Sequence, residues 1–128
     1  MMNDKQSHDV RVEVDSIYIP EQSDPNNELY VFAYTVNIYN NGEVPAKLLT
    51  RHWVITDSHG HIQEVKGEGV IGQHPHLEPG ESFSYSSGTH LETAIGVMEG
   101  SYQMRADDGT LFDAQIPAFT LAVPNTLH

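Results

Sequence analysis

The stretch GEGVIG has the G-x-G-x-x-G spacing of loops that bind phosphate groups. Such a loop binds phosphate when it opens a helix, because the first amides of the helix and its dipole hold the anion. Here Pro75, Pro79 and Gly80 follow closely and exclude a helix of useful length. The motif therefore favours glycines that mark bulges and positive-φ positions. Anion binding and partner binding remain alternatives for Gly67, Glu68, Gly69, Val70, Ile71 and Gly72.

Arg51 is the cation that we expect beside this loop. It shares the predicted inward face of its strand with Leu49, Trp53 and Ile55. A partly buried arginine requires a partner, so we expect it to pair with Glu13 or to stack on Trp53 or Tyr102. A structural role is favoured, and the functional alternative is an anion anchor next to the glycine loop.

Two histidine pairs have a spacing that could hold a metal ion. His59 and His61, and also His74 and His76, place two imidazoles on one side of an extended segment, since residues i and i+2 share a face. Imidazole suits cobalt, nickel or zinc better than magnesium. Both pairs lie in polar turns, and a structural site would require further ligands. Solvated histidines are therefore favoured over a metal site, and no cofactor is predicted.

The sequence offers no recognisable catalytic set. Ser82, Ser84 and Ser86 alternate along one strand, which is typical of its outer face, and no G-x-S-x-G elbow is present. Asp107 and Asp108 are typical of a hairpin turn. We therefore predict a protein without catalytic residues, although spacing alone leaves open a triad assembled in space.

The composition limits which partners and which cellular compartment we expect for the protein. Six basic residues against eighteen acidic ones give a net charge of −12. Because nucleic acids and anionic lipids attract clustered cations, neither is an expected partner. Cysteine is absent, no apolar run approaches the roughly 20 residues of a membrane span, and the start lacks a signal-peptide pattern. A soluble, cytoplasmic protein is expected.

Hydrophobic residues recur with a period of two along most of the chain, which predicts strands. The row Tyr30, Phe32, Tyr34, Val36 and Ile38 should point inward. After Val14 the apolar positions shift by one residue, which predicts a bulge near Asp15 and Ser16. Pro117 predicts a bulge or an edge position in the last strand. Residues 89–98 are expected to form an ordered loop or a short turn.

These signals together predict an all-β fold of seven to eight strands with turns near 40–43, 57–60, 77–81 and 107–110. Such a pattern is typical of an antiparallel β-sandwich or barrel, and the lone Trp53 with a late tyrosine favours an immunoglobulin-like or fibronectin type III-like sandwich. We expect a flexible N-terminus over residues 1–8 and one domain over residues 9–124.

Three blocks in order, RHWVITDSHG, GEGVIGQHPHLEPGESFSYSSG and GVMEGSYQM, resemble the bacterial ApaG family over roughly residues 8–124. The resemblance implies an immunoglobulin-like or fibronectin type III-like sandwich, with the family's glycine motif at Gly67, Gly69 and Gly72. It also implies an association with cobalt resistance and magnesium efflux, and with genes that act on diadenosine tetraphosphate. Related domains in eukaryotic F-box proteins and a DNA-polymerase-interacting protein look like protein-recognition modules. No catalytic residues are implied.

We therefore expect a non-catalytic module that binds an unidentified protein partner through residues 67–76 and 87–98, since binding residues commonly lie on loops held by a rigid scaffold. Exposed edge strands also allow a homodimer. Two alternatives stay open: a sensor of divalent cations or phosphorylated metabolites, and an enzyme acting on nucleotide polyphosphates.

Overall fold

The computed structural model describes residues 7–125 and consists of strands with two short 3₁₀ turns. The strands are β1 (Val10–Tyr18), β2 (Tyr30–Asn40), β3 (Ala46–Asp57), β4 (Ile62–Glu68), β5 (His76–Leu77), β6 (Ser82–Leu91), β7 (Ile95–Ala106) and β8 (Leu111–Ala122). The 3₁₀ turns are η1 (Pro20–Gln22) and η2 (Pro25–Asn27), and both lie between β1 and β2.

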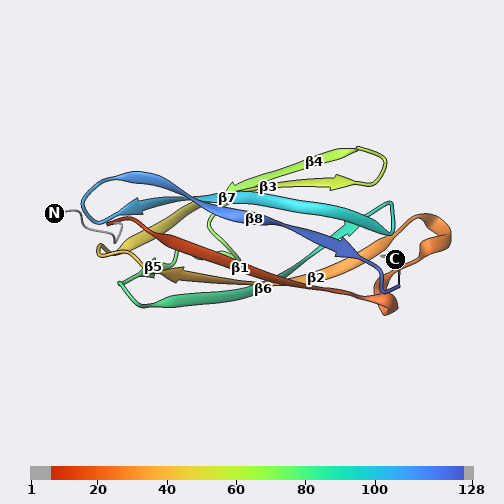
Figure 1. The fold of residues 1–128 in the computed structure, drawn as a ribbon, viewed down its shortest axis with the longest axis horizontal. Coiled ribbons are helices and arrows are strands. Elements are labelled where there is room, and N and C mark those ends of the chain that lie inside the picture. The colour runs from red at the N-terminus through yellow and green to blue at the C-terminus, as the bar shows by residue number, and fades with distance from the viewer. Residues whose placement is uncertain (1–6, 126–128) are drawn as a thin grey trace.

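The strands form two antiparallel sheets that pack face to face (Figure 1). One sheet has the order β1-β2-β6, and the other has the order β4-β3-β7-β8 with the short β5 also paired to β3. Strands β1 and β8 belong to different sheets but contact each other along one side of the sandwich. The predicted antiparallel β-sandwich of seven to eight strands is confirmed.

The core follows the alternation of β2. Phe32, Tyr34, Val36 and Ile38 are buried, as the sequence predicts, while the residues between them are partly exposed. Trp53 of β3 lies at the centre of the core and is 2% exposed. Its ring contacts the rings of Tyr34, Tyr102 and Phe119. Aromatic rings from both sheets therefore fill the space between the layers.

The predicted bulge near Asp15 and Ser16 is wrong. Strand β1 pairs with β2 without a register shift as far as Tyr18. Tyr18 keeps the inward phase and its ring lies 5.5 Å from that of Phe32. Ile17 consequently points outward and is 65% exposed. An exposed isoleucine costs little in a strand, because its branched side chain still suits extended backbone.

A bulge that the sequence did not predict lies in β3. The pairing of β3 with β7 shifts between Leu48 and Thr50, so Leu48 rather than Leu49 is buried. The bulge switches the inward phase, and Trp53 and Ile55 then continue the buried row. Arg51 joins that row only because of this bulge.

Residues 89–98 also differ from the expected loop. Most of them form the end of β6 and the start of β7, and only residues 92–94 of this segment lie between the two strands, where the chain passes from one sheet to the other. Their β-branched residues suit strands better than loops. The buried Thr93 stabilises the connection by donating its hydroxyl to the carbonyl of Ile95, at 2.8 Å.

The bulge expected at Pro117 is confirmed, because the β7–β8 register shifts there on an edge strand.

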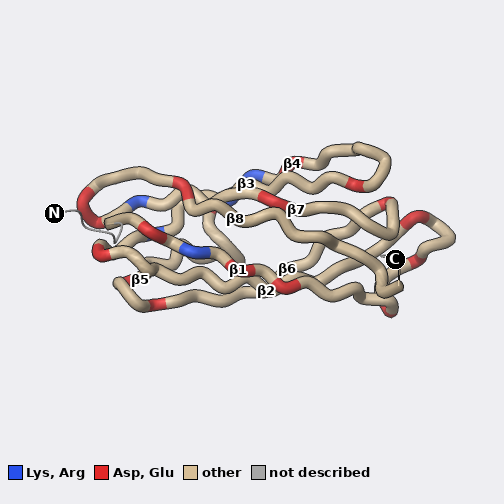
Figure 2. Tube along the Cα trace, in the orientation of Figure 1, with Lys and Arg blue, Asp and Glu red and all other residues tan. Residues whose placement is uncertain are grey.

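Acidic residues outnumber basic ones, and the basic residues do not gather into one surface (Figure 2). Asp and Glu occur along both layers and in the turns, whereas the few Lys and Arg are scattered. Within residues 7–125, no helix has the length and apolarity needed to cross a membrane.

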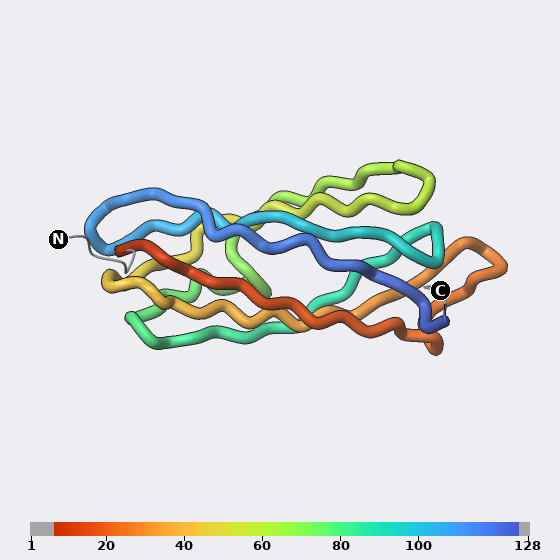
Figure 3. The backbone as a smooth tube through the Cα atoms, in the orientation of Figure 1, coloured from red at the N-terminus to blue at the C-terminus, as the bar shows by residue number. Residues whose placement is uncertain are grey.

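The described part of the chain, residues 7–125, begins and ends at opposite ends of the long axis (Figure 3). Positions 1–6 of the expected flexible N-terminus lie outside the described residues. His8 contacts the β7–β8 turn, because its Nε2 lies 2.8 Å from Oδ2 of Asp108. That turn is confirmed at residues 107–110, with Gly109 at a φ of +90°.

Candidate functional site

The glycine motif folds as a tight turn between β4 and β5. Val70 and Gln73 exchange two backbone hydrogen bonds of 2.9 Å each. The two residues between them, Ile71 and Gly72, have φ angles of +43° and +77°. Positive φ at both central residues is the requirement of a type I′ turn, which normally contains Asn-Gly. An isoleucine in the first position is unusual, because a β-branched side chain is strained there.

The turn directs its two apolar side chains in opposite directions. Val70 is 1% exposed and belongs to the core, whereas Ile71 is 55% exposed at the tip. Figure 3 shows the chain between β4 and β5 bending from one layer toward the other at about mid-length. The turn is therefore anchored from inside the sandwich while it presents Ile71 to solvent.

Close packing accounts for two of the motif glycines. A Cβ atom on Gly67 would lie 2.7 Å from Cζ of Arg51, which passes directly beneath it. A Cβ atom on Gly69 would lie 2.2 Å from the carbonyl oxygen of Gln73, and Gly69 also has a φ of +60°. Larger residues at either position would displace the guanidinium group or open the turn.

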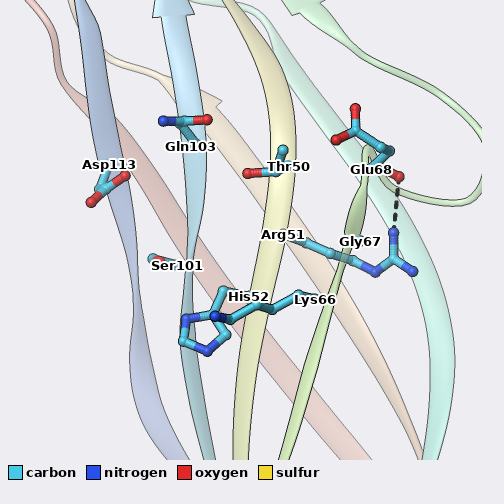
Figure 4. Close-up of a pocket in the computed structure, with 9 residues that line it drawn as sticks. All are labelled: Thr50, Arg51, His52, Lys66, Gly67, Glu68, Ser101, Gln103 and Asp113. Carbon is cyan, nitrogen blue, oxygen red and sulfur yellow. Dashed lines mark hydrogen bonds between the residues drawn. The ribbon is translucent and has the colours of Figure 1, made fainter.

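Arg51 fastens the turn to the sheet. Its Nη1 donates a hydrogen bond of 2.9 Å to the carbonyl oxygen of Glu68 (Figure 4) and another of 2.9 Å to the carbonyl oxygen of Gly69. The expected partner Glu13 lies instead on β1 in the other sheet. Arg51 and Gly67 are directly paired across β3 and β4, which explains why the guanidinium group reaches this loop.

Three amides of the loop donate hydrogen bonds within the protein. The N–H of Gly69 donates to the carbonyl of Leu49, and those of Val70 and Gln73 donate to each other's carbonyls. A phosphate-binding loop instead directs several free N–H groups at one point. The geometry therefore supports the structural interpretation of the glycine spacing.

A shallow polar groove of about 500 Å³ lies beside the loop on the outer face of the larger sheet (Figure 4). It is lined by Thr50, Arg51, His52, Lys66, Gly67, Glu68, Ser101, Gln103 and Asp113. Lys66 is a cation, whereas Glu68 and Asp113 are anions, so the groove has mixed charge. Small-molecule pockets are usually enclosed, whereas this groove is open to solvent, so it suits side chains of a protein partner better.

A second, smaller cavity of about 150 Å³ opens between the sheets behind the loop and also includes Arg51. Next to it, the hydroxyl groups of Tyr85 and Tyr102 form a buried hydrogen bond. Burial raises the pKa of Tyr85 to about 12 and raises the pKa of Tyr102 as well. Both hydroxyls are therefore protonated at neutral pH and cannot act as general bases.

The tyrosine hydroxyls were not among the predicted site residues. Tyr34, whose pKa burial also raises, lines the same cavity as Arg51. The signal in the sequence was available, because Tyr34, Tyr85 and Tyr102 each occupy an inward position of a predicted strand. Three inward tyrosines on three strands indicate a polar cluster inside the core.

Comparison with known proteins identifies the family. A family model described as the ApaG domain matches residues 20–106. The chain belongs to the ApaG family. Protein ApaG of Dechloromonas aromatica strain RCB is 56% identical over 127 residues, which cover 99% of this chain and 100% of that relative. Protein ApaG of Pseudomonas aeruginosa strain LESB58 is 57% identical with the same coverage.

A solved structure agrees with this assignment. The crystal structure of the putative ApaA protein from Bordetella pertussis superposes with a TM-score of 0.92 at 49% sequence identity, covering 95% of this chain and 99% of that chain. The resemblance to the ApaG family that the sequence blocks indicated is therefore confirmed.

The two histidine pairs have different surroundings in this ApaG-family fold. The rings of His59 and His61 lie 6.2 Å apart between centroids, and Nδ1 of His61 is 3.4 Å from Oδ2 of Asp57. His74 donates from Nδ1 to the carbonyl of Leu48 at 3.2 Å. Nε2 of His76 lies 2.9 Å from Oδ1 of Asp107. Metal binding by either pair stays the less favoured alternative that the sequence left open.

Proposed function

We propose that this ApaG-family protein is a non-catalytic module that recognises another protein through the turn at residues 70–73 and the polar groove beside it. The single observation that carries the proposal is Ile71. An apolar, β-branched residue stands exposed at the tip of a turn, with a φ of +43°. Unusual backbone conformations concentrate at functional sites, where the surroundings impose them.

The surroundings of Ile71 are suited to imposing that conformation. Val70 anchors the turn in the core, and Arg51 holds the chain just before it through the two carbonyl groups of Glu68 and Gly69. A partner would therefore meet a tip that is already ordered. Preorganised contacts lose little entropy on binding, which is the main cost that protein recognition must offset.

The groove that includes Gly67 and Glu68, the first two residues of the glycine motif, supplies the polar part of the proposed surface. Exposed apolar residues surrounded by polar ones are typical of protein–protein contacts. Edge strand β4 borders the groove and offers a second mode, the addition of a strand by the partner or by another copy of the chain. A net charge of −12 favours a protein with a basic surface over nucleic acid or membrane.

We place this module in the cytoplasm as part of the same proposal. The association of the family with cobalt resistance and magnesium efflux remains an expectation about the process in which the partner acts. Sensing of phosphorylated metabolites has less support, because three amides of the loop already donate to carbonyl groups of the protein. Catalysis on nucleotide polyphosphates stays the second alternative.

The test is affinity capture at physiological salt from lysate of the native cell, with three baits compared by quantitative mass spectrometry. The baits are the parent protein, Ile71→Asn and the matched control Ile62→Asn, which changes an isoleucine that is 67% exposed in β4. We expect a protein that the parent and Ile62→Asn retain and that Ile71→Asn loses. Equal retention by all three baits would contradict the proposed surface.

A further inference from the structure

A cluster of possible metal ligands lies at the other end of β4, away from the glycine turn. Asp57 is the last residue of β3, His61 directly precedes β4, and Glu92 directly follows β6. The cluster thus joins a hairpin of the larger sheet to the end of an edge strand of the smaller one. It borders a cavity of about 190 Å³.

The three side chains can converge on one point. Ligand atoms of Asp57, His61 and Glu92 all lie within 4.8 Å of one another, and Oδ2 of Asp57 is 3.4 Å from Nδ1 of His61. An ion held at about 2.0–2.2 Å from each atom requires ligand atoms separated by roughly 3–4 Å. The side chain of His61 is 72% exposed, so it can make the small adjustment that remains.

Asp57 is the fixed member of the cluster. Its side chain is only 7% exposed. Its Oδ1 accepts backbone hydrogen bonds from His59 and His61, at 2.9 and 3.0 Å, which leaves Oδ2 directed at the imidazole of His61. Outer hydrogen bonds of this kind orient the ligands of metal sites.

We propose that Asp57, His61 and Glu92 form a binding site for a divalent transition-metal ion. One imidazole nitrogen and two carboxylate oxygens suit zinc and its neighbours in the first transition row better than magnesium or calcium, which prefer oxygen ligands alone. His90 and Gln63 also border this cavity.

Another histidine with two carboxylates in the fold provides a contrast. His76 contacts Asp107 through Nε2 at 2.9 Å and Glu78 through Nδ1 at 3.7 Å. Opposite ring nitrogens point away from each other, so these two carboxylates cannot share an ion with one nitrogen of His76. Within residues 7–125, Asp57, His61 and Glu92 are the group in which three such ligand atoms meet.

The experiment is isothermal titration of the tag-free, full-length protein with zinc chloride. It is repeated with His61→Gln, Glu92→Gln, Asp57→Asn and the matched control His76→Gln. Asparagine retains an oxygen that can accept the two backbone hydrogen bonds, so Asp57→Asn removes the charge and preserves the turn. Circular dichroism and thermal unfolding of each metal-free variant establish that the fold is intact.

We expect one ion per chain for the parent and the His76→Gln control. Each of the three site variants should bind zinc at least about 10-fold more weakly, and magnesium should bind at least about 100-fold more weakly than zinc. Backbone amide shifts in an NMR titration should concentrate at residues 57–63 and 90–94. The absence of saturable binding, equal affinity in the site variants, or weakened binding by His76→Gln would each overturn the proposed site. Comparable affinity for magnesium would overturn its assignment to transition metals.

Discussion

Replacing Ile71 with asparagine should stabilise the fold even though it removes apolar surface. The left-handed conformation costs an L-residue about 1–2 kcal/mol, and asparagine avoids most of this cost by local hydrogen bonding. Ile71 is 55% exposed, so less than half of its surface is covered. Complete burial of an isoleucine contributes about 1.5–3 kcal/mol, and the covered part therefore contributes about 1 kcal/mol at most, since the unfolded chain already shields some of it. We expect a net stabilisation of roughly 0.5–1 kcal/mol.

The measurement is urea unfolding followed by tryptophan fluorescence. Trp53 is the only tryptophan and is 2% exposed, so its emission reports the loss of the core directly. The gain corresponds to an increase in Tm of roughly 2–3 °C for a chain of this length. The matched control is Ile62→Asn in β4, where the backbone is extended and the same change should destabilise the fold by up to about 1 kcal/mol through lost strand preference.

The two variants together separate strain from hydrophobicity. If Ile71→Asn lowered stability by 1 kcal/mol or more, as expected from simple loss of apolar contact, the reasoning about the turn would be refuted. Equal effects at both positions would also refute it, because only Ile71 has a positive φ. A more stable Ile71→Asn variant that no longer binds the partner would show that the native residue trades stability for recognition.

Three further predictions concern the anchors of the fold. Gly67→Ala should destabilise the protein by about 1–2 kcal/mol, because the new methyl group would displace the guanidinium group of Arg51 and weaken its hydrogen bonds to the carbonyls of Glu68 and Gly69. In a double-mutant cycle, Arg51→Ala should therefore make Gly67→Ala less costly. Tyr102→Phe should cost about 1–3 kcal/mol in urea unfolding, because it leaves the buried partner hydroxyl without its hydrogen bond, and a cost near zero would contradict the buried pair. The backbone hydrogen bond from Thr110 is the main cause that lowers the pKa of Asp108 from 3.8 to about 2. Its stabilisation is therefore present above pH 4 and disappears as the pH falls toward 2, so Asp108→Asn should flatten this part of the stability profile in acid titrations.

The sequence predicted the parts of the fold that depend on local alternation. The inward row from Phe32 to Ile38 was readable because β2 is unbroken and central in its sheet. Where two apolar residues are adjacent, the alternation of apolar and polar residues cannot decide which of them points inward. Leu48 and Leu49 compete for the same inward position, and the bulge that selects Leu48 depends on pairing with β7.

The candidate sites depend on contacts that alternation does not encode. Arg51 reaches the glycine loop because it is paired with Gly67 across β3 and β4, a register that a single sequence does not specify. Asp57 and Glu92 meet because strands of different sheets end on the same side of the sandwich. The histidines of the HGH motif were a useful signal, and Asp57 lies only four residues before His61, but Glu92 is far from both in the sequence and is brought to them only by the fold.

Both proposed surfaces lie at the ends of the same edge strand, β4. The glycine turn follows its last residue, and the proposed metal ligand His61 precedes its first. Strands β1 and β8 contact each other along one side of the sandwich, whereas near β4 and β6 a cavity opens beside Arg51. An ion held by Asp57, His61 and Glu92 would connect the two sheets on this open side and should stabilise the folded state by mass action, by about 2.7 kcal/mol at an ion concentration 100 times the Kd. The same stabilisation in Glu92→Gln would contradict this connection, because Glu92 is the only one of the three ligands that follows a strand of the smaller sheet.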